Sequence, residues 1–345
     1  MNHPASQRAV WPDYAKGLCI ILIVAIHTID GVFRAGVGTP TPLWNMIHDL
    51  GYAFMVNVFF VLSGYFAQQS MTKSGWRHGL HSVTTGLLYP YLLWTTIQTS
   101  LAIVFKGGNN VFAWSDFPGC LLNGSMQFWF LHALIIIYIM DMVLQACRIS
   151  AFIRFILSCC VFLIGWYTGP LRYRWLNEFS GTYLFFTIGC IAGHLRLRRP
   201  SAPQLVAGCI GGFSVLFICC SSGAGFNTPL QLCSTLGGIT GCLSLCAMLP
   251  VSSSMNWLAI VGFNSLQLYC AHVIFASTAR AALLHFGCRN FLWHCGVGLT
   301  AAMGLSLVAA AVDRKHLGFL FRLPKPGLAR PKTQSICSAE PSHIG

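Results

Sequence analysis

Ten long apolar stretches run through this chain, separated by short polar connections. A hydrocarbon core of ~30 Å requires about 20 apolar residues in helical conformation, and the backbone polar groups of such a segment must be satisfied within it. The stretches lie approximately at 15–34, 50–69, 83–105, 125–146, 152–168, 179–195, 203–222, 229–249, 264–285 and 291–311. The sequence therefore predicts an all-α fold, a polytopic membrane helical bundle of about ten transmembrane helices.

The composition excludes an ordinary soluble protein. Of the 345 residues, 55% are hydrophobic and 8% are Asp, Glu, Lys or Arg, whereas about a quarter of the residues in a soluble domain are charged. The net charge of +13 suits anionic membrane lipids, and no pattern typical of a nucleic-acid partner occurs.

The 16 cysteines lie mostly inside apolar runs without any C-x-x-C pair, so we predict neither a disulfide framework nor a metal site.

Lysine and arginine are distributed unevenly between the two sides of the predicted bundle. With an even number of spans, the side that holds both termini carries fifteen of the 21 Lys and Arg residues, and the opposite side carries six. The positive-inside rule then places both termini in the cytoplasm. We predict a cytoplasmic N-terminus at 1–14, one ten-span domain at 15–311, and a basic tail at 312–345 that is disordered or lies along the membrane surface.

The first apolar stretch holds two ionisable residues at a marked spacing. Ten residues, nearly all apolar, separate Lys16 from His27. A helix rises ~1.5 Å per residue, so His27 lies roughly 16 Å beyond Lys16, about half of a ~30 Å hydrocarbon core. A cation at one membrane face and an imidazole near the midplane indicate function, because an ionisable group is costly at that depth.

Lys16 belongs to a D-x-x-K-G opening at 13–17. Four further motifs follow this pair in a fixed order: FFVLSGYF at 59–66, LLYPYLLW at 87–94, FWFLHAL at 128–134 and GFNSLQLYCAHVIF at 262–275. Together with the Lys16–His27 spacing, the set resembles the acyltransferase-3 superfamily of integral-membrane enzymes that O-acylate carbohydrates. The resemblance extends from about residue 8 to 311. One motif departs from it, because the segment from His81 lacks the arginine pair that family members often carry before the Pro-Tyr of the third span, and the nearest arginine is Arg77.

The resemblance implies catalytic roles in the first span. His27 is the candidate general base for a hydroxyl group, since imidazole titrates near neutrality; the alternative is a structural hydrogen bond between helices. Asp30 lies at i+3 and can share a face with His27. It would orient the ring, or it would be an interfacial acid beside the external loop.

The resemblance also implies a donor and an acceptor site. Lys16 and Arg77 are the candidates for binding the phosphates of acetyl-CoA, although Lys16 would also suit a headgroup anchor. Ser63, His132 and His272 are candidates for lining the cavity, with close helix packing or interhelical hydrogen bonds as alternatives. A polar external cluster is the candidate acceptor site, or else a solvated loop, and it consists of Arg172, Arg174 and Glu178.

The predicted function is transfer of an acetyl group from acetyl-CoA to a sugar hydroxyl of a cell-surface or secreted glycan or glycolipid. The family includes members that modify fucosyl groups, among them those of rhizobial lipo-chitin signals, and this resemblance implies a fucosyl or related sugar acceptor. Acetyl-CoA is a co-substrate, and no other cofactor is expected. The expected location is a bacterial inner membrane. The alternative is a multi-span transporter of a sugar or other small solute, although the sequence lacks the paired halves typical of transporters.

Overall fold

The computed structural model describes residues 9–105, 112–169, 174–195, 200–222 and 229–324, and within them every regular element is helical. The α-helices are α1 Trp11–Arg34, α2 Pro42–Val83, α3 Tyr89–Val104, α4 Phe117–Asn123, α5 Trp129–Ala146, α6 Ala151–Thr168, α7 Arg174–Leu195, α8 Ala202–Ser221, α9 Pro229–Met248, α10 Asn256–Phe263, α11 Ser265–His285 and α12 Phe291–Val312. Short helical turns complete the set: η1 Thr84–Leu88, η2 Trp114–Asp116, η3 Met126–Phe128, η4 Ser253–Met255 and η5 Asp313–Leu317. The predicted all-α membrane bundle is confirmed.

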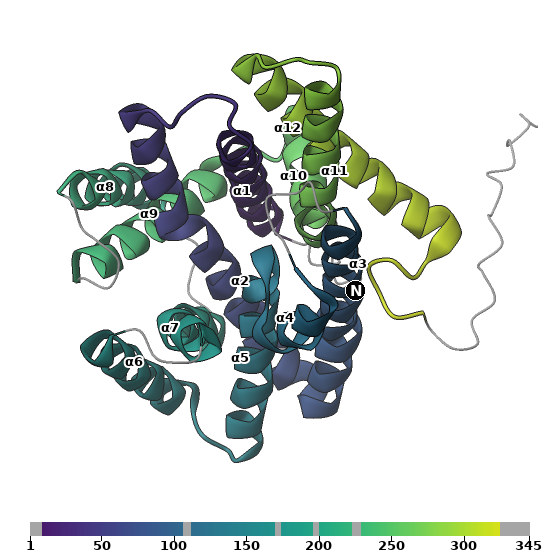
Figure 1. Cartoon of the computed structure of the whole chain (residues 1–345). Helices are drawn as coiled ribbons and strands as arrows, with labels where there is room; N and C mark the ends of the chain where they lie inside the picture. Colours follow the sequence, from purple (N-terminus) through teal and green to yellow (C-terminus); the bar gives the residue numbers. More distant parts are fainter. Residues whose placement is uncertain (1–8, 106–111, 170–173, 196–199, 223–228, 325–345) are drawn as a thin grey trace, which may run out of the picture.

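The first helix lies in the middle of this bundle. α1 packs against α2, α9, α10, α11 and α12, while α6 and α8 lie at the edge (Figure 1). Half of the most apolar window of α1 is buried, against 17% of that of α6 and 22% of that of α8. The outer helices therefore expose large apolar side chains such as Ile164 and Ile210, as expected for helices that face lipid. The chain is an integral membrane protein.

All ten predicted spans coincide with described helices, but fewer helices meet a criterion of length and apolar composition. Among the described residues, seven helices are long and apolar enough to cross a membrane, or up to eight if the bent pair α10 and α11 counts as one span. That count treats the stretch 42–104 as one span. A straight helix of 63 residues would be ~95 Å long, about three times the thickness of the hydrocarbon core. The stretch contains two predicted spans, and Gly75 breaks it with a φ of 75°. The other predicted span missing from that count is α7, which begins with polar residues.

Glycine permits close contact between backbones in the core of the bundle. A Cβ on Gly17 would lie 3.2 Å from the Gly262 nitrogen, and one on Gly262 would lie 2.8 Å from the Gly17 nitrogen. α1 and α10 therefore touch main chain to main chain. The pair Gly237 and Gly241, which the sequence suggests as a packing motif, contacts Gly212 of α8 in the same manner.

The first part of the tail follows a defined path. After η5, the Asp313 carboxylate accepts hydrogen bonds from the Phe319 and Leu320 nitrogens at 3.0 and 2.8 Å. The Trp94 indole donates to the Leu320 carbonyl at 2.8 Å, and the Phe321 ring stacks on Trp94. The segment up to 324 thus packs on α3, where the rings of Trp94 and Phe321 are both buried. The remainder of the predicted tail, 325–345, lies outside the described residues.

Candidate functional site

A cavity of about 190 Å³ opens between α1, α2, α5 and α11. Lys16 and His27 of α1 both line it, as do Ser63 and Tyr52 of α2. Each of these pairs is eleven residues apart, and the two helices run in opposite directions, so the cavity follows both helices for ~16 Å. Its wall is otherwise mostly apolar, with Ile, Leu, Met, Phe and Val side chains. The site is therefore a narrow apolar passage with an ammonium group at one end and an imidazole at the other.

Two histidines meet at the inner end of this passage. The His27 Nδ1 atom lies 3.0 Å from the His272 Nε2 atom, and the rings are stacked with 14° between their planes. The His272 Nδ1 atom lies 2.9 Å from the carbonyl oxygens of both Leu268 and Tyr269. His272 is fully buried. The two helices α1 and α11 are thus joined by a histidine pair anchored on main-chain carbonyls.

These contacts determine where the protons of a neutral pair lie. A carbonyl oxygen only accepts, so His272 carries its proton on Nδ1, and its Nε2 is left as an acceptor. His27 must then donate from Nδ1. The Nε2 atom of His27 is left with a free lone pair, on a residue that lines the cavity. The arrangement presents a base to whatever occupies the passage.

Lys16 lies at the other end and keeps access to solvent. Its ammonium group forms an ion pair of 2.7 Å with the Asp13 carboxylate, and its side chain is 22% exposed. A partly exposed ammonium with one carboxylate neighbour can still bind an anionic group of a ligand. The structure therefore places Lys16 and His27 in one site, as the spacing predicts.

Asp30 does not contact the candidate base. Its carboxylate pairs with the His48 Nε2 atom at 3.4 Å, and the His48 ring stacks on Tyr52 at 4.4 Å between centroids. His272, which is 245 positions away in the sequence, takes the orienting place that the i+3 spacing suggests for Asp30. Asp30 instead belongs to a polar group of side chains at the end of the cavity beyond His27.

The remaining predicted residues divide into two sets. Ser63 lines the cavity, and His272 reaches it through His27. His132 is absent from the cavity wall, and its ring lies 5.7 Å from that of Tyr91. Arg77 is exposed and lies over Trp76 at 5.5 Å, away from the passage.

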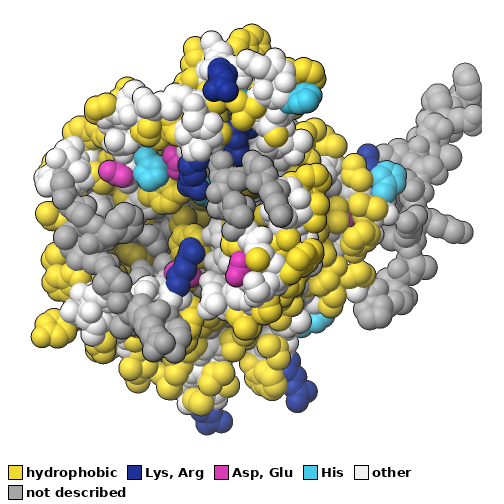
Figure 2. All heavy atoms as spheres, viewed as in Figure 1, with side chains coloured by type: hydrophobic (Ala, Val, Ile, Leu, Met, Phe, Trp, Pro, Cys, Tyr) yellow, Lys and Arg dark blue, Asp and Glu magenta, His cyan; other side chains and the backbone are white. Residues whose placement is uncertain are grey.

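The predicted acceptor cluster is only partly described. Arg174 and Glu178 form an ion pair of 2.6 Å on α7, and neither belongs to the cavity wall. Arg172 lies outside the described residues. Figure 2 shows that charged and histidine side chains gather near the middle of one face of the molecule, inside a largely hydrophobic rim.

Sequence reasoning missed several polar residues at the site. Tyr52, Gln127 and Tyr269 line the cavity. Tyr269 lies three residues before His272 on the same helix face, and that spacing is a signal for it. Gln127 has no comparable signal, because its position depends on contacts with α3 and α11. No group of three or more His, Cys, Asp or Glu side chains suited to a metal ion occurs in the described part of the chain.

Comparison with known proteins identifies the family. The model of the acyltransferase-3 family, described as an acyltransferase domain, matches residues 9–311. The chain belongs to this family. This agrees with the order of motifs in the sequence and accounts for an oriented base in a membrane-embedded cavity.

Two curated relatives carry the name nodulation protein NolL. The one from Sinorhizobium fredii is 24% identical over 192 residues, which cover 54% of this chain and 49% of the relative. The one from Mesorhizobium japonicum is 26% identical over 199 residues, which cover 48% of this chain and 51% of the relative. The chain thus spans about half the length of these relatives. No solved structure matches it significantly.

Proposed function

We propose that this protein transfers an acetyl group from acetyl-CoA to a sugar hydroxyl of a cell-surface or secreted glycan. The observation that carries the proposal is the single passage that joins Lys16 to the free Nε2 atom of His27. The negatively charged nucleotide of the donor would stay at the mouth beside Lys16. The pantetheine arm is long and slender, and it would extend along the apolar wall toward His27.

The chemistry follows from the roles of the two nitrogen atoms of His27. Nε2 takes the proton of the sugar hydroxyl while the hydroxyl oxygen attacks the thioester carbonyl carbon. A carbon–oxygen ester bond forms, the carbon–sulfur bond breaks, and coenzyme A leaves as a thiolate that takes the proton back from His27. The imidazolium formed in between donates from Nδ1 to His272, so its charge is stabilised inside the bundle.

The proposed acceptor rests on the relatives and on the family resemblance. The two relatives are named nodulation proteins, and the resemblance includes enzymes that act on fucosyl groups of lipo-chitin signals. We therefore favour a fucosyl residue as acceptor. Arg172, Arg174 and Glu178 remain candidates for binding it, and Asp30 with His48 lies closer to the base. With cytoplasmic acetyl-CoA as donor, Lys16 would face the cytoplasm in a bacterial inner membrane.

The test is release of free thiol from acetyl-CoA by the purified, detergent-solubilised protein. Methyl fucoside serves as acceptor, and formation of acetylated sugar is followed by mass spectrometry. The wild-type protein should release thiol only with acceptor present. His27→Ala should reduce the rate by ~10²–10⁴-fold, the usual contribution of a general base, at an unchanged protein yield.

Two results would contradict the proposal. Near-normal transfer by His27→Ala would remove that residue from the mechanism. Uptake of labelled sugar into vesicles without thiol release would instead favour the transporter, since only an acyltransferase consumes the thioester.

A further inference from the structure

A second chain of hydrogen bonds ends at the same cavity as the histidine pair. Gln127 of η3 lines the cavity, and its Nε2 atom donates to Gln98 Oε1 of α3 at 2.6 Å. The Nε2 atom of Gln98 donates to the Cys270 carbonyl of α11 at 2.7 Å. The side chains of Gln127 and Gln98 are 8% and 4% exposed. Buried amides of this kind are held in one orientation by their partners.

The main chain determines the direction of this relay of hydrogen bonds, which runs from Gln127 through Gln98 to the Cys270 carbonyl. The Cys270 carbonyl can only accept, so the amide nitrogen of Gln98 faces Cys270 and its oxygen faces Gln127. Gln127 must then present its own nitrogen. An amide nitrogen carries two hydrogens, and the bond to Gln98 uses one. No second acceptor for the Gln127 nitrogen occurs among the residues that the structure describes, so one N–H is left for the cavity.

The same turn of α11 orients the histidine pair. Its carbonyls at Leu268 and Tyr269 hold His272, and the next carbonyl, at Cys270, holds Gln98. The Tyr269 hydroxyl donates to the Gln127 main-chain oxygen, which ties η3 to this turn. Three consecutive carbonyls thus present a lone pair on His27 and an N–H on Gln127 to one cavity. A base and a hydrogen-bond donor on opposite sides of a carbonyl group are the two elements that acyl transfer needs.

We propose that Gln127 is the oxyanion donor of this acyltransferase and that Gln98 is its positioning residue. The inference rests on the proposed function. When the hydroxyl oxygen attacks, the electron pair of the thioester C=O bond moves onto oxygen, and the Gln127 N–H binds that developing charge. The pair returns as the carbon–sulfur bond breaks. The donor acts in a largely apolar cavity, where an oriented hydrogen bond is stronger than it would be in water.

The experiment compares isosteric variants of the full-length, detergent-solubilised protein. Gln127→Met keeps the length of the side chain and removes both N–H groups. It should lower kcat by ~10²–10³-fold, while the Kd for coenzyme A, measured by equilibrium dialysis, stays at the wild-type value. Gln98→Met should lower kcat less, because Gln127 remains but is no longer held in place. Gln145→Met, near the C-terminal end of α5, is the control at a half-buried glutamine that does not belong to the cavity wall, and it should keep its kcat.

Each other outcome has a defined meaning. A wild-type kcat in Gln127→Met, or a weaker Kd with kcat intact, would overturn the inference. If Gln127→Met does not accumulate, Gln127→Glu decides by the same measurement, since it preserves the shape and removes the donor at neutral pH. A wild-type protein that binds coenzyme A but releases no thiol with any sugar would contradict the proposed function, which is a different failure.

Discussion

At the scale of single residues, the structure shows how the proposed base, His27, is accommodated inside the membrane. A charged side chain at this depth is costly, and the pair formed by His27 and His272 can be neutral until the reaction delivers a proton. Asp30 would have supplied a permanent charge, and the structure places it against His48 instead. In the proposed mechanism, His272 orients the base without a buried carboxylate.

His272 gives the first prediction at this scale. His272→Phe keeps a ring of similar shape and removes the acceptor for His27 Nδ1. Loss of one hydrogen bond to a charged group should lower kcat roughly 10- to 100-fold, with KM for acetyl-CoA unchanged. Thiol release at several donor concentrations measures both constants. A change in KM alone would show that His272 shapes the cavity and does not orient the base.

Lys16 gives the second prediction. Lys16→Ala removes a cation at the mouth of the passage, so KM for acetyl-CoA should rise more than kcat falls. Lys73→Ala is the control, because it removes an exposed cation of α2 that does not belong to the cavity wall. An unchanged donor KM in Lys16→Ala would leave Lys16 as a membrane anchor, and Arg77 would be the next candidate.

At the scale of elements, one motif is explained by the bend between α10 and α11. The two helices meet at 74°, and Gly262 in α10 contacts the Lys16 end of α1. Ser265 and Tyr269 then line the cavity, and His272 meets His27. The spacing G-x-x-S-L-x-x-Y-x-x-H therefore places the contacts of this segment along the length of the passage.

A buried ion pair attaches α6 to the rest of the bundle. Arg154 is 1% exposed, and its guanidinium contacts the Asp141 carboxylate of α5 and, at 2.7 Å, Gln68 Oε1 of α2. Beyond this, α6 contributes few buried polar contacts, among them Ser158 to Thr187 of α7 at 2.6 Å. The outer helix thus packs along α7 and is joined to α5 and α2 through one charged side chain.

Arg154 gives a prediction of stability. Arg154→Leu leaves the Asp141 carboxylate buried without its cation. Removing one partner of a buried ion pair typically lowers the free energy of unfolding by about 3–5 kcal/mol. The midpoint of thermal unfolding, measured in detergent, should fall markedly. The double variant Arg154→Leu with Asp141→Leu should recover most of the loss, because it removes both charges. Arg148→Ala, an exposed cation in the preceding turn, should leave the midpoint unchanged. A double variant as unstable as the single one would contradict this account.

The sequence predicts well where the helices lie along the chain, but it predicts poorly how they are bent and which side chains meet between them. Each predicted span lies in a helix because an apolar run of that length allows no other structure in lipid. The 74° bend at Asn264 has no comparable signal, since the hydrogen bond of the Asn264 side chain is local, to the Ile260 carbonyl. Lys16, His27 and Ser63 could be assigned to one cavity from span order. The pairing of His27 with His272, and the relay from Cys270 to Gln127, join distant segments and required the structure.

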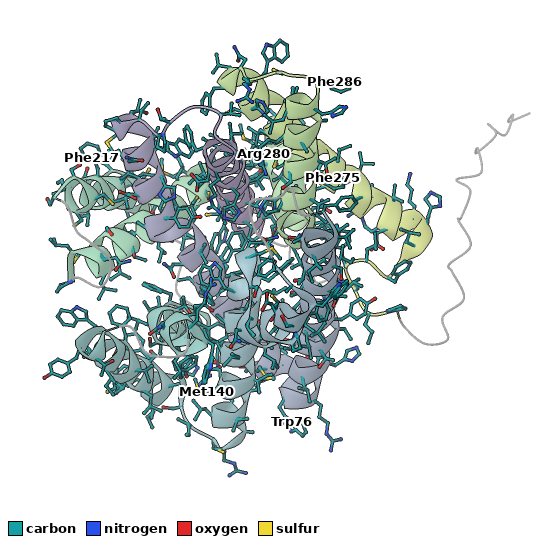
Figure 3. All side chains as sticks on the ribbon, viewed as in Figure 1. Trp76, Met140, Phe217, Phe275, Arg280 and Phe286 are labelled. Carbon is teal, nitrogen blue, oxygen red and sulfur yellow. The ribbon has the colours of Figure 1, made fainter. Side chains whose placement is uncertain are left out.

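At the scale of the whole molecule, the bundle packs α1 against five helices, of which α2 and α11 also line the cavity, and leaves α6 and α8 at its edge (Figure 1). The end of α1 beyond His27 is closed by a second cation. Arg280 of α11 is 9% exposed, and its guanidinium lies against Gly31, where a Cβ would come within 2.5 Å of it. Figure 3 shows Arg280 beside α1 near the centre of the view. A cation thus lies near each end of α1, with Lys16 in the cavity wall and Arg280 outside it, and orientation in the membrane decides which of these two ends faces the cytoplasm.

Orientation is the last prediction. The excess of Lys and Arg on the side of the termini predicts that this side, and hence Lys16, faces the cytoplasm. Reporter fusions after Lys73 and Arg148 should therefore be active as cytoplasmic reporters, whereas fusions after Lys106 and Gly169 should be active as external ones. The same result would place Arg280 and the Asp30–His48 pair at the external end, open to a sugar that arrives from outside. A consistent inversion of all four fusions would put Lys16 outside, where acetyl-CoA is absent. The donor would then have to enter beside Arg280, and the direction of the proposed passage would be reversed.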